Sequence, residues 1–286
     1  DITRSNVDVL PSLNLAYELS QKSNLRFAAS QTLSRPEFRE LAPFSFFDFN
    51  NFVEIVGNSE LQRAKITNLD LRYELFPGNG QLISGSVFFK HFQNPIEQTL
   101  NSDIGGGTLS TTYRNATSAT NFGLELEYRK SLEFIGAWFN RLTLATNLAL
   151  IQSEVNLENV AGASNRPLQG QSPFVFNMSL NYKDEKNWSG AISVNRVGKR
   201  IAFVGTDIYP DFYENPRWVV DLSVNKSILK DKLEIKMNLA DLFAQDLVFY
   251  QNKVGNTNTN FEENSDNVMR RFRYGRTVSI GLSYKF

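Results

Sequence analysis

The sequence predicts an all-β protein, an antiparallel transmembrane β-barrel of which about eleven strands lie in this chain. Three observations predict it. Apolar and polar residues alternate along most of the chain, the alternating runs reach about ten residues, and the connections between them are short and long in turn. A tilted strand needs about that length to cross a bilayer, whereas strands in soluble sandwiches usually have five or six residues.

Six alternating runs occupy the first half of the chain. In the first run Leu13 and Leu15 share one face, and Asn14 points to the other. Pro36 follows the second run and ends it, because proline has no N–H to donate to a strand ladder. The hairpin sequence Pro77-Gly78-Asn79-Gly80 separates the third and fourth runs. The six runs cover about residues 7–20, 25–33, 63–76, 81–93, 122–129 and 142–150.

Five further runs occupy the second half, at about residues 174–183, 188–199, 218–224, 233–239 and 271–286. The last run predicts one unbroken strand from Arg271 to Phe286, because apolar and aromatic residues share one parity nearly throughout. A soluble protein rarely ends in this way, since chain termini usually fray into water. The last strand of a bacterial outer-membrane barrel does end on an aromatic residue, so Tyr284 and Phe286 are a candidate signal for outer-membrane assembly.

The connections separate a barrel from a sandwich. Short connections lie near residues 22, 78, 134, 185 and 230, and long connections lie near residues 47, 105, 162, 207 and 256. Brief periplasmic turns and extended extracellular loops give a barrel this rhythm, and a sandwich has no reason to show it. The apolar parity is expected to face lipid, and tyrosine and tryptophan near strand ends fit interfacial girdles.

Composition excludes several classes of function. The 286 residues include 30 basic and 30 acidic side chains, one histidine and no cysteine. Zero net charge argues against a nucleic-acid partner, and the lack of cysteine excludes disulfides and thiolate metal sites. No nucleophile has a plausible base beside it, so we expect no enzyme activity, no cofactor and no metal. A mean hydropathy of -0.32 and the absence of a run of about 18 apolar residues exclude a transmembrane helix.

The strand count predicts an incomplete barrel. Single-chain bacterial barrels have even numbers of strands, and the first strand here leads into a short turn, which places Asp1 outside the cell. We therefore expect residues 1–286 to be the carboxy-terminal part of a larger barrel domain. Its plug domain and amino-terminal strands would lie in sequence before Asp1, since an open strand edge is intolerable in lipid.

Several motifs resemble TonB-dependent outer-membrane receptors of the Bacteroidota type, over essentially the whole chain. The resemblance is carried by Leu33-Ser34-Arg35-Pro36-Glu37-Phe38, Asn94-Pro95-Ile96-Glu97, Asn238-Leu239-Ala240-Asp241-Leu242-Phe243 and Tyr284-Lys285-Phe286. It implies a 22-stranded barrel with an amino-terminal plug and a TonB box. It also implies plug-gated import, driven by the proton-motive force, of a scarce nutrient such as a siderophore, glycan, peptide or vitamin. This chain would then be the carboxy-terminal half of the barrel.

The same resemblance implies a location in the bacterial outer membrane and a set of partners. These are outer-membrane lipid and lipopolysaccharide, the TonB complex through the missing amino-terminal region, the barrel assembly machinery and a surface lipoprotein that acts as a lid. The alternative function is a non-transporting outer-membrane barrel that acts as an adhesin or assembly component. An outer-membrane phospholipase or protease is a weaker third possibility, because no catalytic cluster is visible.

Two groups in the long connections are candidate ligand-binding residues. The first is aromatic and comprises Phe44, Phe46, Phe47, Phe49 and Phe52. Exposed rings bind sugars, peptides and chelates, but packing of these rings on one another to shape a long loop is the favoured alternative. The second group, Arg271 and Arg273, could bind an anionic ligand or lipopolysaccharide phosphate. Pairing with Glu262, Glu263 or Asp266 is the favoured alternative.

Three other features favour ordinary structural roles. Glu125, Glu127, Arg129 and Arg141 are expected to form a charged wall inside the barrel that contacts the plug. His91 has no second histidine or carboxylate at ligand spacing, so it is expected to be a polar strand residue. Gly105-Gly106-Gly107 lacks the Lys-Ser/Thr of a phosphate loop, so loop flexibility is expected there.

Overall fold

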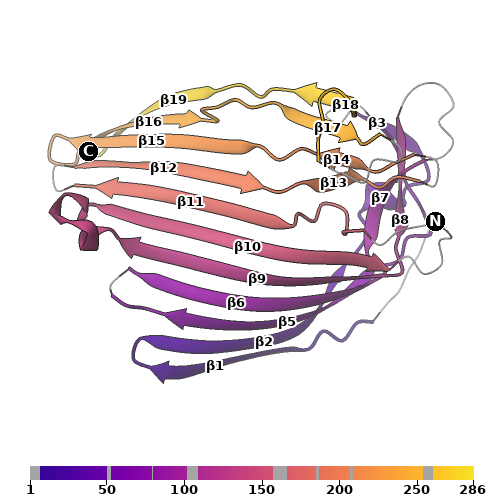
Figure 1. The fold of residues 1–286 in the computed structure, drawn as a ribbon, viewed down its shortest axis with the longest axis horizontal. Helices are drawn as coiled ribbons and strands as arrows, with labels where there is room; N and C mark the ends of the chain where they lie inside the picture. The colour runs from indigo at the N-terminus through magenta and orange to yellow at the C-terminus, as the bar shows by residue number, and fades with distance from the viewer. Residues whose placement is uncertain are drawn as a thin grey trace.

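A computed structural model describes residues 7–49, 53–78, 80–101, 109–156, 166–184, 187–206, 209–253 and 260–286. Its main element is one curved sheet of eleven antiparallel strands (Figure 1). Neighbours in the sheet follow chain order, with β1 and β19 at the two edges. The strands are β1 Ser12–Ser20, β2 Ser23–Ser34, β5 Ala64–Leu75, β6 Leu82–Gln93, β9 Ser118–Ser131, β10 Leu142–Asn156, β11 Phe174–Lys183, β12 Trp188–Val197, β15 Trp218–Ile228, β16 Leu233–Ala240 and β19 Thr277–Tyr284.

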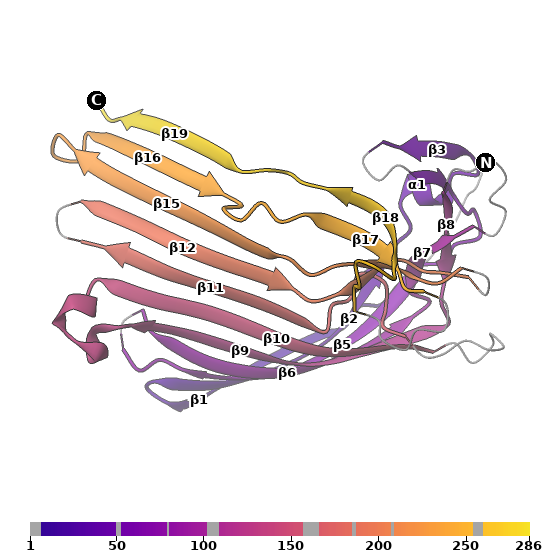
Figure 2. The same ribbon diagram turned by 45° about the horizontal axis from the view of Figure 1, so that its top comes forward.

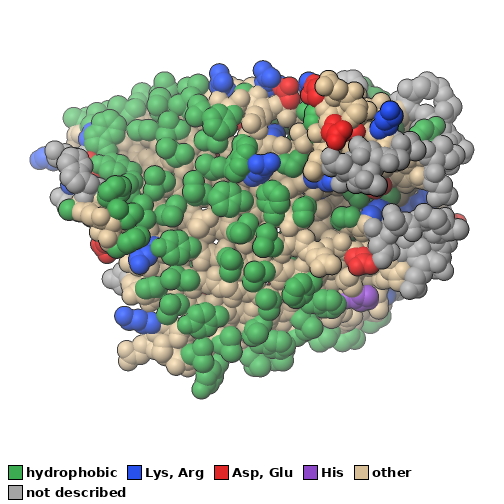
Figure 3. All heavy atoms as spheres, in the orientation of Figure 1, with side chains coloured by type: hydrophobic (Ala, Val, Ile, Leu, Met, Phe, Trp, Pro, Cys, Tyr) green, Lys and Arg blue, Asp and Glu red, His purple; other side chains and the backbone are tan. Residues whose placement is uncertain are grey.

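The predicted alternation sets the two faces of this sheet. Strand registers place apolar residues of successive strands opposite one another, so that one face carries continuous rows of them. One such row comprises Leu15, Phe27, Leu71, Val87, Leu124 and Leu150. Hydrophobic side chains cover the visible face of the molecule across the sheet (Figure 3). The opposite parity carries the polar and charged residues, so the eleven predicted strands and their faces are confirmed.

The two rims of the sheet differ as the connections predicted. At one rim the strands are joined by tight turns, which we call the turn rim; the longest of these holds two short 3-10 helices, η1 Glu133–Ile135 and η2 Ala137–Phe139. The long connections all leave the opposite rim (Figures 1 and 2). Because barrels have short periplasmic turns and longer extracellular loops, the long-connection rim is the extracellular one.

The long connections carry secondary structure that the sequence did not predict. They contain the short helix α1 Phe38–Leu41 and two four-stranded sheets, of order β3-β4-β8-β7 and β13-β14-β17-β18. We call these elements together the cap, and Figure 2 shows them clustered at the extracellular rim. Their strands are β3 Ser45–Asp48, β4 Val53–Val56, β7 Ile96–Leu100, β8 Ser110–Asn115, β13 Arg200–Phe203, β14 Phe212–Glu214, β17 Leu247–Gln251 and β18 Asn267–Phe272.

Two predicted strand boundaries are wrong. The single strand expected from Arg271 to Phe286 is divided into β18, in the cap, and β19, in the main sheet. Residues 273–276 between them belong to neither strand, and Gly275 has a φ of +81°, which suits glycine because it lacks a Cβ. The first strand begins at Ser12 after Pro11, so Val7 and Val9 lie before it with exposed side chains.

Helices contribute little to the architecture. Among the described residues, no helix combines the length and the apolar character needed to cross a membrane.

Candidate functional site

The well-packed interior of the chain lies in the cap. The largest fully buried side chains in the described residues are Val53, Leu61, Leu100, Thr111, Val155, Ile201 and Tyr250. All but Leu61 lie on cap strands or at the extracellular end of a main strand. Rows of apolar residues on the main sheet stay exposed instead. The cap is therefore a packed layer built by several loops together, which gives the extracellular rim a defined shape.

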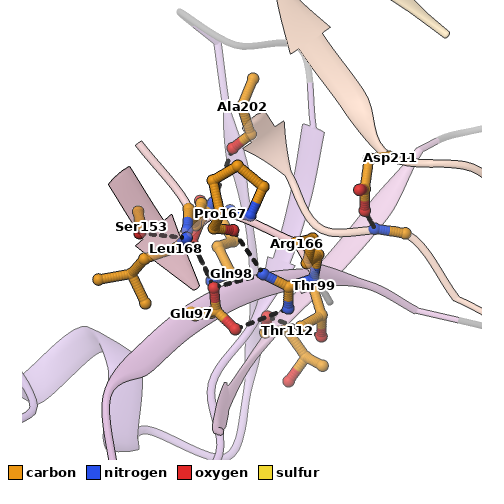
Figure 4. A network of polar contacts seen from close by, with 12 residues as sticks. Glu97, Gln98, Thr99, Thr112, Ser153, Arg166, Pro167, Leu168, Ala202 and Asp211 are labelled. Atoms are coloured by element: carbon orange, nitrogen blue, oxygen red, sulfur yellow. Dashed lines mark hydrogen bonds and ion pairs between the residues drawn. The ribbon is translucent and has the colours of Figure 1, made fainter. Parts of the chain in front are cut away.

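A buried ion pair lies at the centre of the cap (Figure 4). The guanidinium of Arg166 donates two parallel hydrogen bonds, of 2.7 and 2.8 Å, to the carboxylate of Glu97. Only 3% of the Glu97 side chain and 13% of the Arg166 side chain are exposed. Burial alone would lower the pKa of Arg166, but the pairing with Glu97 more than offsets it and raises that pKa. A bidentate arginine–carboxylate contact of this kind is among the strongest charge-assisted hydrogen bonds in proteins and also fixes the orientation of both side chains.

The same contacts join the two sheets of the cap. Gln169 donates its backbone N–H to Glu97 (3.0 Å), accepts the N–H of Gln98 at its side-chain oxygen (2.6 Å), and donates its amide to the carbonyl of Ala202 (2.6 Å). Backbone bonds between Leu100 and Val204 (2.8 Å) and between Val204 and Gln98 (3.1 Å) join β7 to β13. Three long connections thus form one polar network (Figure 4).

An aromatic cluster forms the second half of the cap. The rings of Tyr213 and Tyr250 lie 5.8 Å apart, and Phe261 lies 5.0 Å from Tyr250. Burial is the main cause that raises the pKa of Tyr213 to about 12, and the neighbouring Asp211 charge raises it further. Burial likewise raises the pKa of Tyr250, whose side chain is fully buried. Both phenols therefore keep their protons where exposed tyrosines lose them.

This cluster gives a testable pH dependence. Tyrosine in the unfolded chain titrates near pH 10, so Tyr213 contributes stability that is complete below pH 10 and is lost as pH rises to about 12. The tyrosinate absorbance of wild-type protein minus that of Tyr213→Phe should show one group titrating near pH 12. Lys199, which stacks on Tyr213 at 5.0 Å, is present in both proteins. A difference curve centred near pH 10 would contradict the assignment.

The predicted aromatic group lies at the edge of the cap. Phe46 and Phe47 are on β3, and the rings form two pairs, Phe44 with Phe46 at 6.4 Å and Phe47 with Phe49 at 5.1 Å. Packing of the rings on one another, the alternative to ligand binding, is thus present in the structure. Phe44 and Phe49 nevertheless remain 58% and 76% exposed. Phe52 lies outside the described residues, as do Gly105, Gly106 and Gly107.

The predicted arginine group is engaged with acidic residues. Arg271 contacts Glu263 at 2.6 Å and Arg273 contacts Asp246 at 2.7 Å, so the structure contains one of the expected acidic partners and one that was missed. Glu262 instead accepts a hydrogen bond from Ser265, and Asp266 accepts one from Asn252. Both arginines remain 38% or more exposed, which leaves their charge at the cap surface.

The inner face of the sheet carries a chain of ion pairs that includes one residue of the predicted charged wall, Glu127, whereas Arg141 lies in the turn before β10. Arg72 connects Glu74 (3.0 Å) with Glu127 (2.8 Å), and Arg26 contacts Glu74 at 2.8 Å. Next to this chain of ion pairs, Glu127 and Arg129 line a hollow of about 380 Å³. Asparagine side chains from three adjacent strands also line it; they are Asn147, Asn177 and Asn195. The face can therefore offer hydrogen bonds to a polar occupant of the lumen.

Metal binding is not supported by a ligand cluster. The described part of the chain holds no group of three His, Cys, Asp or Glu residues that could bind a metal ion. His91 lies on β6 opposite Thr67 and Thr120, on the same parity as the exposed Val87 and Phe89.

Two cation–aromatic pairs mark the borders of the apolar face. Near the turn rim the Lys226 ammonium lies 4.8 Å from the Trp188 ring, and towards the cap the Arg196 guanidinium lies 4.7 Å from the Trp218 ring. Eight residues separate Trp188 from Arg196 on β12, which is about 26 Å along a strand. A strand tilt of roughly 40° reduces this to about 20 Å, close to the height of the apolar band of an outer-membrane barrel.

The most buried site residues were not identified from the sequence. Glu97 and Arg166 lie 69 positions apart, and Arg166 directly follows the undescribed residues 157–165. Nothing in the local pattern distinguishes either residue from a solvated loop charge. The only available indication was that Glu97 belongs to the Asn94-Pro95-Ile96-Glu97 motif.

Comparisons with known proteins agree with this geometry. The ferric enterobactin receptor PfeA from Pseudomonas aeruginosa is 19% identical (TM-score 0.63), and the match covers 97% of this chain and 40% of that receptor. The copper transporter OprC is 18% identical (TM-score 0.65; 96% and 39% covered), and the siderophore receptor PirA from Acinetobacter baumannii is 13% identical (TM-score 0.61; 97% and 41% covered). At these identities the likeness shows the fold alone.

Sequence comparison gives the family. A search of curated proteins finds no match. The model of the outer membrane protein beta-barrel family matches residues 1–284, nearly the whole chain. The chain spans about two fifths of the length of the solved receptors that it resembles. The chain therefore belongs to the outer membrane protein beta-barrel family, and its eleven-stranded sheet is part of an outer-membrane barrel.

Proposed function

We propose that this chain is the carboxy-terminal half of the barrel of a TonB-dependent receptor of the Bacteroidota type. The receptor imports a scarce nutrient, such as a siderophore, glycan, peptide or vitamin, through a plug-gated lumen and uses the proton-motive force. One observation carries the proposal: the sheet is open at β1 and β19, yet 97% of the chain aligns with about 40% of a ferric enterobactin receptor. Eleven further strands from upstream sequence would close it, because lipid does not tolerate an open edge.

The polar inner wall supports a gated lumen. The ion pairs of Arg26, Glu74, Arg72 and Glu127, with the asparagine-lined hollow beside them, form a surface suited to hydrogen bonding with a plug domain. The plug and the TonB-contacting segment would both be supplied by upstream sequence. Acid–base chemistry does not fit this wall, because its charges are paired with one another.

The cap supports ligand selection at the cell surface. Its exposed rings, Phe44, Phe47 and Phe49, and its surface charges, Arg271 and Arg273, would contact the ligand, lipopolysaccharide or a lipoprotein lid. The Glu97–Arg166 network would hold the loops in one arrangement, so that less loop entropy is lost when a ligand binds.

Nutrient-limited growth tests the proposal. Strains that carry the full-length gene, a gene deletion, or the gene in a background without TonB are grown on single scarce sources of iron, vitamin, glycan or peptide. We expect one source on which growth requires both the gene and TonB. Growth that is equal in all three strains on every source, together with surface adhesion that requires the gene, would favour the adhesin alternative.

The carboxy-terminal residue gives a prediction on assembly. Phe286 is fully exposed, and its ring lies 5.2 Å from that of Tyr284, so both are available to the barrel assembly machinery. Phe286→Ala should lower the amount of folded protein in outer membranes severalfold, as measured by heat-modifiable gel migration. Lys285→Ala, on the opposite parity, serves as the matched control. Equal amounts of folded protein for the two variants would contradict this role.

A further inference from the structure

The apolar face of the sheet is hollowed near the turn rim. A groove of about 580 Å³ opens there on β11, β12 and β15, and Gly190 is one of the residues that line it. In the row of residues that crosses the groove, Gly190 lies between Tyr182 and Val224. Ile192 and Leu222 border the groove towards the cap, and Trp188 borders it towards the turn rim.

The groove is a built feature of the sheet. Gly190 has no side chain to fill the row, and a Cβ added to it would lie only 2.8 Å from the backbone carbonyl oxygen of Ser223. Close approach of the two strands therefore requires glycine at this position. The hollow does not depend on the rotamer of a mobile side chain.

Opposite charges lie at the rim end of the groove. The carboxylate of Asp184 accepts hydrogen bonds from the Trp188 backbone N–H (2.8 Å) and from the Tyr182 hydroxyl (3.3 Å), which fixes its position beside the groove. The Lys226 ammonium lies over the Trp188 ring at 4.8 Å. A carboxylate and an ammonium thus flank the tryptophan at the level where lipid headgroups begin.

We propose that this groove binds one acyl chain of a zwitterionic phospholipid, whose headgroup ammonium lies at Asp184 and whose phosphate lies at Lys226. The groove opens on the face that meets lipid, so a hydrocarbon chain is the occupant that reaches it. A lipid whose headgroup carries only negative charge would have no cation to pair with the Asp184 carboxylate. The site lies at the turn rim and therefore in the periplasmic leaflet. This inference rests on the outer-membrane location and holds whether or not the protein imports a nutrient.

Native mass spectrometry of the full-length protein tests the site. Protein is released from nanodiscs that contain equal amounts of phosphatidylethanolamine and phosphatidylglycerol, and the retained lipid is identified. Wild type should retain one phosphatidylethanolamine. Val224→Trp, which fills the groove, should lose it, and Leu150→Trp, on the same face outside the groove, should retain it.

The headgroup contact has a separate variant that does not fill the groove. Lys226→Gln removes the charge that faces the phosphate and should lower retention of phosphatidylethanolamine by at least about tenfold, the effect of one lost charge-assisted hydrogen bond. Retention of the same lipid by wild type and Lys226→Gln, or equal retention of the two lipids by wild type, would overturn the proposal. This variant decides the question even if Val224→Trp does not assemble.

Discussion

Replacing Glu97 with alanine is expected to destabilise the cap by about 3 to 5 kcal/mol, because the Arg166 charge is then left buried without a partner. Opening of the cap should become about two to four orders of magnitude more frequent, since each 1.4 kcal/mol is about a factor of ten. Hydrogen exchange at the backbone amides of Gln98, Leu100 and Val204, which join the two cap sheets, measures this directly. Protection of the main strands should not change.

Two controls isolate the buried pair. Glu263→Ala breaks the exposed pair with Arg271 and should cost less than about 1 kcal/mol. The double variant Glu97→Leu with Arg166→Met removes both buried charges and should recover most of the protection, because an apolar pair carries no desolvation penalty. Unchanged exchange in Glu97→Ala would show that the pair does not hold the cap together.

Replacing Ile192 with arginine is expected to destabilise the barrel by about 2 to 4 kcal/mol, the cost of a lipid-facing charge near the bilayer midplane. Ile192 lies four residues from Trp188 and four from Arg196, midway between the two borders of the apolar face. Its strand partners Leu180 and Leu222 offer no polar contact. The free energy of unfolding, measured by urea titration of the full-length protein in lipid vesicles, should fall by this amount.

The neighbouring residue provides a matched control. Ser193 lies on the inner face and is paired with Asp221, so Ser193→Arg places the same charge beside water and an acidic group. This variant should change the free energy of unfolding by less than about 1 kcal/mol. If the two arginines had equal effects, the assignment of the two faces of β12 would be wrong.

The main sheet could be predicted because the local sequence of each strand defines its extent and its two faces. Alternation over ten or more residues determines which side chains face lipid, and each tight turn fixes the register of the next hairpin. The run predicted at residues 81–93 agrees with β6 at Leu82–Gln93, and the run at residues 174–183 agrees with β11 at Phe174–Lys183. Neither strand needs a distant contact to define its two faces.

The cap could not be predicted because its strands depend on distant partners. β14 has three residues, and β4 pairs in parallel with β8, more than fifty positions later. Such short segments show no useful alternation, and burial comes from other loops. The Glu97–Arg166 pair has the same origin, since only the folded cap brings the two residues together.

The wrong boundary in the last strand has a specific cause. Phe272 and Tyr274 have the same parity as Val278 and Ile280, so the alternation continues across the break at Gly275. A break in strand pairing that preserves parity leaves no trace in the alternation of apolar and polar residues. The glycine was the only local indication, and a single glycine also occurs inside continuous strands such as β19.

Single-cysteine labelling tests the central claim, and residues 1–286 contain no cysteine that would compete for the label. A fluorophore is placed in turn at residues 122–127 of β9 in the full-length protein, which is then reconstituted with brominated lipid. We expect strong quenching at Phe122, Leu124 and Leu126 and little at Gly123, Glu125 and Glu127. Uniform quenching, or quenching of the opposite set, would contradict a barrel wall with its apolar face in lipid and its charged face inside.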